Sequence, residues 1–271
     1  MSKLLLGSAT TDYVNQYDRS LLFPIEREAQ RSLLGIGHDA LPFEGRDLWN
    51  AYEFTYLMPS GKPTCLVLQI EVPAASRLII ESKSMKLYLG SFAGSKFDDP
   101  ARVLQVIADD LSAGVGAEVL VRVCAEEDLS VRKAASGVVN LDALPVGVPE
   151  GGYDAGHLTI EGTAEAEAVF VTDLFRSLCP MTGQPDYARV WVQLTGRQLS
   201  DASLQRYLLS FREHGEFAEQ VAERIFVDIS KCAQPRRLGV RTEFTRRGGI
   251  DINAERQQGY SDWTYTRHYR Q

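Results

Sequence analysis

The sequence has no long hydrophobic run and no excess of positive charge. No stretch of its 271 residues approaches the ~20 apolar residues of a membrane-spanning helix, and its start has neither the apolar core nor the cleavage site of a signal peptide. Lys and Arg number 29 against 36 Asp and Glu, a formal net charge of −7. Sequence-independent binding to nucleic acids needs Lys and Arg against phosphate. We therefore expect a cytoplasmic protein that contacts neither membranes nor nucleic acids directly.

Cysteine and histidine are scarce, with four of each. The cysteines contain no C-x-x-C pair and lie far apart, at Cys65, Cys124, Cys179 and Cys232. This spacing argues against a zinc site or a disulfide framework and favours a reducing compartment. The histidines are equally scattered, so no metal site is predicted. A G-x-G-x-x-G segment after a strand is missing as well, so a bound dinucleotide would need another mode of recognition.

What the sequence does contain is an internal repeat within an ordinary globular composition, 44% hydrophobic and 24% charged. Residues 84–92 align with residues 203–211 at an offset of 119, with five of nine positions identical. The same offset pairs Asp109 with Asp228 and Val121 with Val240. Each half reads as a turn, a strand, two helices and a strand. We predict an α+β protein with two modules, residues 1–150 and 151–271, and a linker rich in Gly and Pro within residues 140–165.

Cys179 lies in the sharpest motif, residues 176–186. Pro180, Gly183 and Pro185 place this cysteine on a turn. A nearby cation such as Arg176 would favour its thiolate, and Asp186 could return across the turn as a proton carrier. The alternative is a buried, inert cysteine. That alternative is the one we expect for Cys65, Cys124 and Cys232, which lie in apolar runs.

Residues 80–88 place a carboxylate, hydroxyls and cations at one junction between a strand and a helix. Glu81 could accept two hydrogen bonds from the N–H edge of a guanine-like base. Ser82 could cap the helix, and Lys83 and Lys86 could meet phosphate. The alternative is a helix cap with solvated charges.

Two further segments carry charge in a pattern that could form a site. Glu213, Glu216 and Glu219 recur at every third residue, as either a solvated face or the wall of a site. Arg246 and Arg247 precede two glycines, which allow a close approach of the backbone to a ligand while the arginines bind phosphate. A basic surface turn is the alternative for that segment.

Taken together, residues 81–88, 177–186 and 246–253 resemble the NADPH-dependent 7-cyano-7-deazaguanine reductases of queuosine biosynthesis, in their long two-module form; residues 47–53 agree with this. The resemblance implies tandem tunnelling-fold (T-fold) modules, with antiparallel sheets and helices on one face, in a homodimer. It implies that the nitrile is reduced to an aminomethyl group with two NADPH through a covalent thioimide, without a metal. Cys179 would be the nucleophile and Asp186 the proton donor. The substrate would be bound by Ile80, Glu81, Ser82, Phe217, Ala218 and Glu219, and NADPH by Ser82, Lys83, Arg247 and Gly248.

One position departs from the family pattern. Family members usually have Glu-Phe-His-Glu where this chain has Glu216, Phe217, Ala218 and Glu219. The missing histidine leaves two alternatives to a fully active reductase: an impaired enzyme, or a non-catalytic purine-binding protein. A thiol hydrolase acting on nitriles is a third, but it would not need the segment at Arg247 and Gly248.

Overall fold

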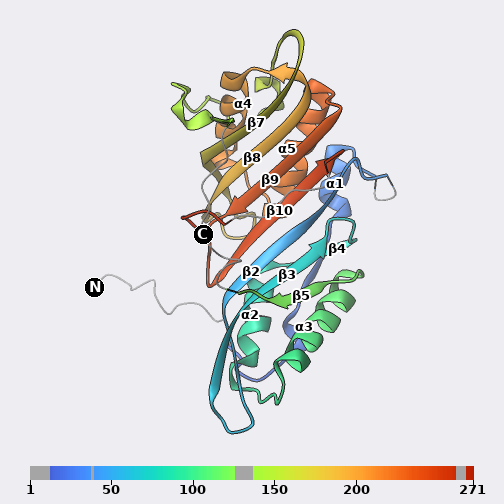
Figure 1. Cartoon of the computed structure of the whole chain (residues 1–271), viewed down its shortest axis with the longest axis vertical. Helices are drawn as coiled ribbons and strands as arrows, with labels where there is room; N and C mark the ends of the chain where they lie inside the picture. Colours follow the sequence, from blue (N-terminus) through green and yellow to red (C-terminus); the bar gives the residue numbers. More distant parts are fainter. Residues whose placement is uncertain (1–12, 38–39, 126–136, 261–266) are drawn as a thin grey trace, which may run out of the picture.

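The computed structural model describes residues 13–37, 40–125, 137–260 and 267–271. Its main feature is a single eight-stranded sheet with the strand order β5-β3-β2-β10-β9-β8-β7-β6 (Figure 1). The strands are β2 (Glu44–Leu57), β3 (Pro63–Pro73), β5 (Leu120–Val123), β6 (Val138–Asn140), β7 (Ile160–Leu178), β8 (Pro185–Leu199), β9 (Arg237–Phe244) and β10 (Ile250–Gln258). Neighbouring strands are antiparallel except β6 and β7. A separate pair joins β1 (Pro24–Glu26) to β4 (Leu78–Ile80).

The helices are α1 (Glu28–Leu34), α2 (Ser82–Ser91), α3 (Pro100–Val115), α4 (Asp201–Leu209) and α5 (Ala218–Ala233). Helix α3 begins at Pro100, because Asp99 caps it by accepting from the Ala101 N–H and proline is favoured in the first turn of a helix. It ends at Gly116, which adopts a positive φ of 70°. Short 3₁₀ turns follow α2 at Phe92–Gly94 and α4 at Ser210–Glu213.

The two halves repeat the same order of elements: a long β-hairpin, two helices and a further strand. The repeat extends to side chains, because each half has an aspartate that accepts from two tyrosine hydroxyls: Tyr17 and Tyr88 on Asp110 at 2.7 Å, and Tyr153 and Tyr207 on Asp228 at 2.6 Å. The pairing of Asp109 with Asp228 was therefore wrong by one residue, and Asp109 instead accepts from Gln105 on the exposed face of α3. The tandem α+β organisation is confirmed.

The halves are joined through the sheet. β10, the last strand of the chain, pairs with β2 of the first half along eight residue positions and with β9 of the second half. The register places Ile252 of β10 opposite Trp49 of β2 on the face covered by α2 and α3, and Ala254 of the same strand on the face that α5 covers. All four long helices therefore lie on one face of a continuous sheet, as predicted.

Each half has its own hydrophobic core beneath its helices. The first contains Met85, Tyr88 and Ile107, and the second contains Tyr207, Ile225 and Phe226, all fully buried. Ile250, from the end of the chain, packs into the first core. The division at residue 150 stays a prediction.

The cysteines expected to be buried differ from one another. Cys65 is exposed on β3 near the tip of its hairpin. The buried residues of this strand begin only at Leu68. Cys124 is buried and Cys232 is half-buried.

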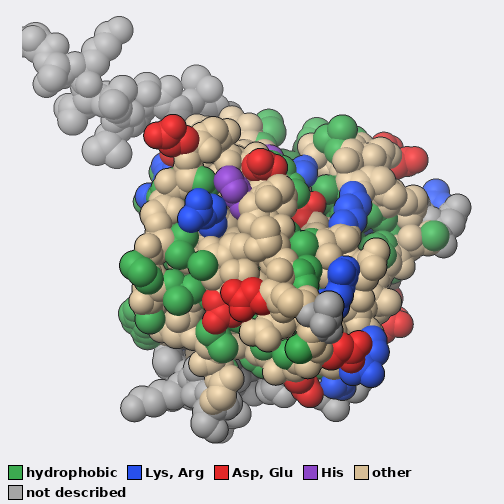
Figure 2. Space-filling model, turned by 90° about the horizontal axis from the view of Figure 1, so that it is seen from above, with side chains coloured by type: hydrophobic (Ala, Val, Ile, Leu, Met, Phe, Trp, Pro, Cys, Tyr) green, Lys and Arg blue, Asp and Glu red, His purple; other side chains and the backbone are tan. Residues whose placement is uncertain are grey.

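Surface charge is mixed on the end of the molecule seen in Figure 2, where acidic and basic side chains of the described residues are interspersed. Among the described helices, none is long and apolar enough to cross a membrane.

Candidate active site

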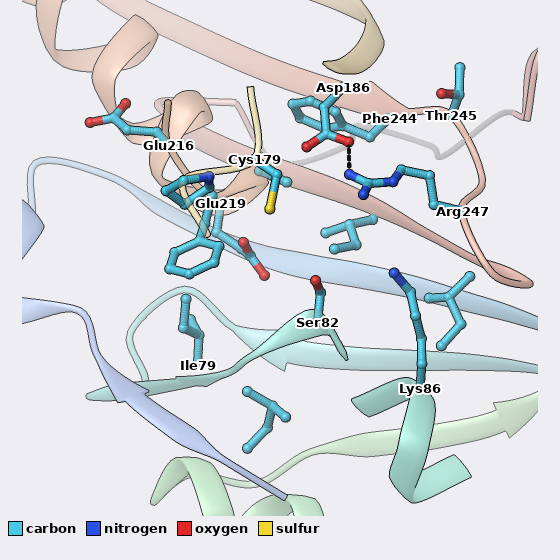
Figure 3. A pocket seen from close by; sticks show the side chains of 16 residues that line it. Ile79, Ser82, Lys86, Cys179, Asp186, Glu216, Glu219, Phe244, Thr245 and Arg247 are labelled. Carbon is cyan, nitrogen blue, oxygen red and sulfur yellow. Dashed lines mark hydrogen bonds and ion pairs between the residues drawn. The ribbon is translucent and has the colours of Figure 1, made fainter. Parts of the chain in front are cut away.

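A pocket of about 590 Å³ lies where the two halves meet. Its walls come from the start of α2, the loop between β7 and β8, the start of α5, and the turn between β9 and β10 (Figure 3). It is lined by Ile79, Ile80, Ser82, Lys86, Cys179, Pro180, Asp186, Glu216, Phe217, Ala218, Glu219, Phe244, Thr245, Arg247, Ile250 and Ile252. Eight of the residues to which the family resemblance gives a role are therefore brought together, from Ile80 to Arg247.

Cys179 occupies the turn that the sequence predicts. β7 ends at Leu178 and β8 begins at Pro185. The Cys179 N–H donates to the Gln184 carbonyl and the Gly183 N–H donates to the Cys179 carbonyl, both at 2.9 Å. Gly183 has a φ of 68°, a conformation that glycine adopts without strain. The turn thus holds the thiol at the pocket wall, and Figure 3 shows the sulfur pointing into the pocket.

The thiol of Cys179 is prepared for ionisation by its own loop. Burial raises the pKa of this thiol, but hydrogen bonds from the Thr182 hydroxyl and from the backbone N–H groups of Met181 and Thr182 outweigh it, and the pKa is below its ordinary value. The cation suggested by the sequence, Arg176, does not supply this effect. Its guanidinium donates instead to Glu213 at 2.8 Å and to the Arg212 carbonyl.

Asp186 lies beside Cys179 across the turn, as expected from the hairpin register that pairs it with Ser177. Its carboxylate accepts a hydrogen bond from Arg247, which also donates to the Gln184 side chain. Asp186 and Arg247 thus form an ion pair at one side of the pocket (Figure 3).

The glutamates at positions 213, 216 and 219 have three different environments. Glu213 is exposed and pairs with Arg176. Glu216 turns away from the pocket toward Arg224, which binds it through two nitrogens (Figure 3). Glu219 is only 3% exposed and points its carboxyl group into the pocket. Burial, and next the negative charge of Asp47, raise the pKa of Glu219 to about 7.

The junction before α2 is organised by Glu81. Its carboxylate accepts from the N–H groups of Lys83 at 2.9 Å and Ser84 at 2.7 Å. Glu81 therefore caps α2, and the cap expected at Ser82 was wrong because Ser82 is the first helical residue. Ser82 lines the pocket, whereas Glu81 and Lys83 do not line it.

A second pocket of about 420 Å³ adjoins the first along Lys86 and Ile250, and Gly248 lies in its wall. Gly248 has a φ of 59°, and a Cβ there would lie 3.3 Å from Lys86 Cδ. Burial lowers the pKa of Lys86, the charge of Arg247 lowers it further, and Glu81, Asp186 and Cys179 act in the opposite direction. Lys86, which lines both pockets, and Arg247, which lines the first, thus place two cations where the pockets adjoin, a donor set that suits phosphate.

Sequence reasoning missed part of the pocket wall. Lys86 was considered only as a phosphate contact at the helix start, although its position one turn after Ser82 on α2 could have indicated the pocket. The apolar wall contributed by Phe244, Ile250 and Ile252 gave no signal, because such residues are typical of any buried strand. Among the described residues, no group of three or more His, Cys, Asp or Glu could hold a metal ion.

Parts of the chain are similar to known families and to a solved structure. Residues 13–123 match the family model described as "Nitrile reductase, 7-cyano-7-deazaguanine-reductase N-term", and residues 185–263 match that of "QueF-like protein". Among solved structures, the apo form of an archaeosine synthase QueF-Like aligns over 38% of this chain and all of its own, with a TM-score of 0.32 and 15% identity.

Curated relatives cover far more of the chain. Proteins named NADPH-dependent 7-cyano-7-deazaguanine reductase from Burkholderia pseudomallei (strain 1106a) and Burkholderia orbicola (strain MC0-3) are each 46% identical to it. The first aligns over 250 residues, 92% of this chain and 90% of the relative, and the second over 252 residues, 92% and 91%. The chain belongs to the family of NADPH-dependent 7-cyano-7-deazaguanine reductases.

Proposed function

We propose that this protein reduces the nitrile of 7-cyano-7-deazaguanine to the aminomethyl group of 7-aminomethyl-7-deazaguanine, with two NADPH, in the biosynthesis of tRNA queuosine. The observation that carries the proposal is one pocket lined by Cys179, Asp186 and Glu219 in a chain of this family. The relatives reported above are all named as reductases, so a non-catalytic purine-binding protein is not supported.

Cys179 acts as the nucleophile in this proposal. A nitrile carbon is a poor hydride acceptor, and addition of the Cys179 thiolate converts it into a thioimide, a better electrophile. The lowered pKa of the thiol favours the thiolate that this step needs. The nitrile nitrogen gains a proton as sulfur attacks, and Asp186, across the turn, is the group to deliver it.

The base is held by groups from both halves. Glu219 from α5 and Glu81 before α2 provide carboxyl groups for its N–H edge, and Ile80, Ser82 and Phe217 form walls around it together with Ala218. The apolar side chains of these walls keep water from the imine that is formed between the two reductions.

NADPH supplies the hydride for each reduction. The residues present suit its phosphates, since Lys86 lines both pockets, Arg247 lines the first, and Gly248 leaves room beside Lys86. Ser82 and Lys83 at the start of α2 complete the proposed cofactor site. Their task is to orient the cofactor over the carbon bound to Cys179.

The resemblance to the family leads us to propose also that the protein is a homodimer in the cytoplasm. Size-exclusion chromatography with light scattering tests the dimer, and a mass of one chain in solution would refute it.

The reaction is tested by mixing the protein with 7-cyano-7-deazaguanine and NADPH and counting both products. Two NADPH should be oxidised for each aminomethyl product formed. Conversion of the nitrile to an amide or acid without NADPH oxidation would instead indicate the thiol hydrolase. Binding of the base without an adduct of Cys179 or any turnover would overturn the proposal.

A further inference from the structure

Glu219 stands between the pocket and a buried group of charges. Its carboxyl group points into the pocket, and on its other side it lines a smaller cavity of about 200 Å³ together with Asp47 and Trp49. Among the described residues, no other residue donates a hydrogen bond to this carboxyl. Its only hydrogen bond among these residues comes from its own backbone N–H, so this buried carboxyl can still accept from a ligand in the space that it faces.

The buried charges behind Glu219, here called the arginine cluster, are Arg27, Arg31, Asp47, Glu223 and Arg256. Each is at most 2% exposed. Asp47 lies 2.5 Å from Arg27 and 2.8 Å from Arg256. Glu223 lies 2.7 Å from Arg31, 2.9 Å from Arg256 and 3.6 Å from Arg27. The cluster joins α1 and β2 of the first half to α5 and β10.

The arginine cluster is incomplete by one negative charge. Its three guanidinium groups carry three positive charges, and the carboxylates of Asp47 and Glu223 balance two. Glu219 lies one helical turn before Glu223, so its ionisation would make the whole set neutral, but it would also place a third anion beside two others without an ion pair of its own. Arg27 and Arg256 favour its charged form, while burial and Asp47 oppose it more strongly.

The pocket side of Glu219 adds few charged groups that could favour either its protonated or its ionised form. The ionisable groups facing Glu219 there are Lys86 on α2, Cys179 and Asp186 on the hairpin, and Arg247, which is paired with Asp186. The balance therefore rests with burial and the arginine cluster, which leave the pKa of Glu219 at about 7, so both its protonated and ionised forms are accessible near neutral pH.

We propose that binding of the base expels a proton from Glu219, and that Asp47 is the positioning residue that sets the pH at which this happens. The inference rests on the proposed function, because it takes the ligand to have the adjacent N–H and NH₂ groups of a 2-amino-4-oxopyrimidine ring. A carboxylate accepts from both groups at once, whereas a carboxylic acid has an O–H that opposes one of them. The ligand thus binds the ionised form, and the O–H bond of the acid breaks with transfer of its proton to solvent.

The experiment uses 7-deazaguanine, which has the same N–H edge but no nitrile, so that Cys179 chemistry does not contribute. Isothermal titration calorimetry in buffers of different ionisation enthalpy gives the number of protons released on binding. With a pKa of about 7 in the free protein, release should be about 0.9 proton at pH 6 and fall toward zero above pH 8, and below pH 7 the affinity should rise about tenfold per pH unit.

Variants assign the released proton. Glu219→Gln should abolish the release, whereas Glu243→Gln, which alters a buried carboxyl of similar pKa outside the pocket, should leave it unchanged. Asp47→Asn should move the midpoint of release downward by about one pH unit, since it removes a nearby negative charge. An independent readout is the infrared band of a protonated carboxyl, which should disappear on binding in the parent and be missing in Glu219→Gln.

Several results would overturn the inference. They are binding without proton release at pH 6, release that persists in Glu219→Gln, a carboxyl band unaffected by ligand, and failure of 7-deazaguanine to bind. An unshifted midpoint in Asp47→Asn would refute the role of Asp47. The reductase proposal is refuted by a different result, the absence of NADPH oxidation with 7-cyano-7-deazaguanine. The titration with 7-deazaguanine contains neither NADPH nor a nitrile, so the two failures can be told apart.

Discussion

Arg247 donates a hydrogen bond to the carboxylate of Asp186, so the residue proposed to hold NADPH is paired with the residue proposed to deliver the proton. We expect NADPH phosphate to draw Arg247 away, which would free the Asp186 carboxylate from this contact when the cofactor is present. The pair would thereby couple cofactor binding to proton delivery.

Arg247→Ala should weaken NADPH binding by on the order of tenfold or more, because one charge-assisted contact to phosphate is lost. Binding of 7-deazaguanine should change little. Arg246→Ala is the matched control, since Arg246 stacks on Tyr52 and lies 3.8 Å from Glu53, outside the pocket wall. Fluorescence titration with NADPH measures both, and equal losses in the two variants would contradict the assignment.

Cys179→Ala should abolish both turnover and the thioimide adduct while leaving the fold intact, because the thiol lies on a turn and contributes little to either core. Mass spectrometry with 7-cyano-7-deazaguanine detects the adduct. Cys65→Ala removes an exposed thiol on β3 and should keep full turnover and parental stability. Appreciable turnover by the Cys179 variant would refute its role as nucleophile.

Ala218→His should raise turnover, since an imidazole at the first turn of α5 would fill the pocket wall beside Glu219 and could exchange a proton near neutral pH. A loosely held ring can cost roughly 100-fold in rate, so part of that factor should be recovered in steady-state assays with NADPH. Adduct formation should already occur in the parent. If parent and variant reduce the nitrile at the same rate, position 218 has no part in the chemistry.

Glu243 should make the protein less stable as pH rises. Burial raises the pKa of Glu243 to about 7 from its ordinary 4.5, although Arg241 and a hydrogen bond from Trp191 oppose the rise. The folded state therefore binds more protons than the unfolded state between these values, and the free energy of unfolding falls as pH increases through them.

Glu243→Gln should remove that contribution. Its free energy of unfolding relative to the parent should rise between pH 5 and pH 8 in urea denaturation. Because the buried His268 and the other titrating groups are the same in both proteins, the comparison isolates Glu243. A difference that does not vary with pH would contradict the raised pKa.

The parts of the site that depend on residues close together in the sequence were predictable. The turn around Cys179 follows from Pro180, Gly183 and Pro185, and the hairpin then brings Asp186 back beside the thiol without any long-range information. The repeat was visible because α2 and α4 keep the same spacing of Ser, Tyr, Leu and Phe. Both features depend on neighbours in the chain.

Contacts between distant segments were not predictable in this way. Arg31 binds Glu223, which is 192 positions away in the sequence. Neither segment contains a pattern from which this pairing could be predicted. The pairing of Asp109 with Asp228 failed because helix register decides which of two adjacent aspartates faces the buried tyrosines. Cys65 was wrongly expected to be buried. An apolar run in the sequence does not show which part of a hairpin extends beyond the core.

The pairing of β10 with β2 has a consequence for the order in which the protein can be made. During synthesis the first half emerges before β10. One edge of β2 is then unpaired, and Ile250 is missing from the first core, because the strand partner and this side chain both come from residues beyond position 249. An unpaired edge is a template for association with other chains, and closure of so long a loop is slow. The nascent chain thus exposes this edge of β2 until residues 250–257 have been synthesised, so β2 is where a chaperone would prevent association with other chains.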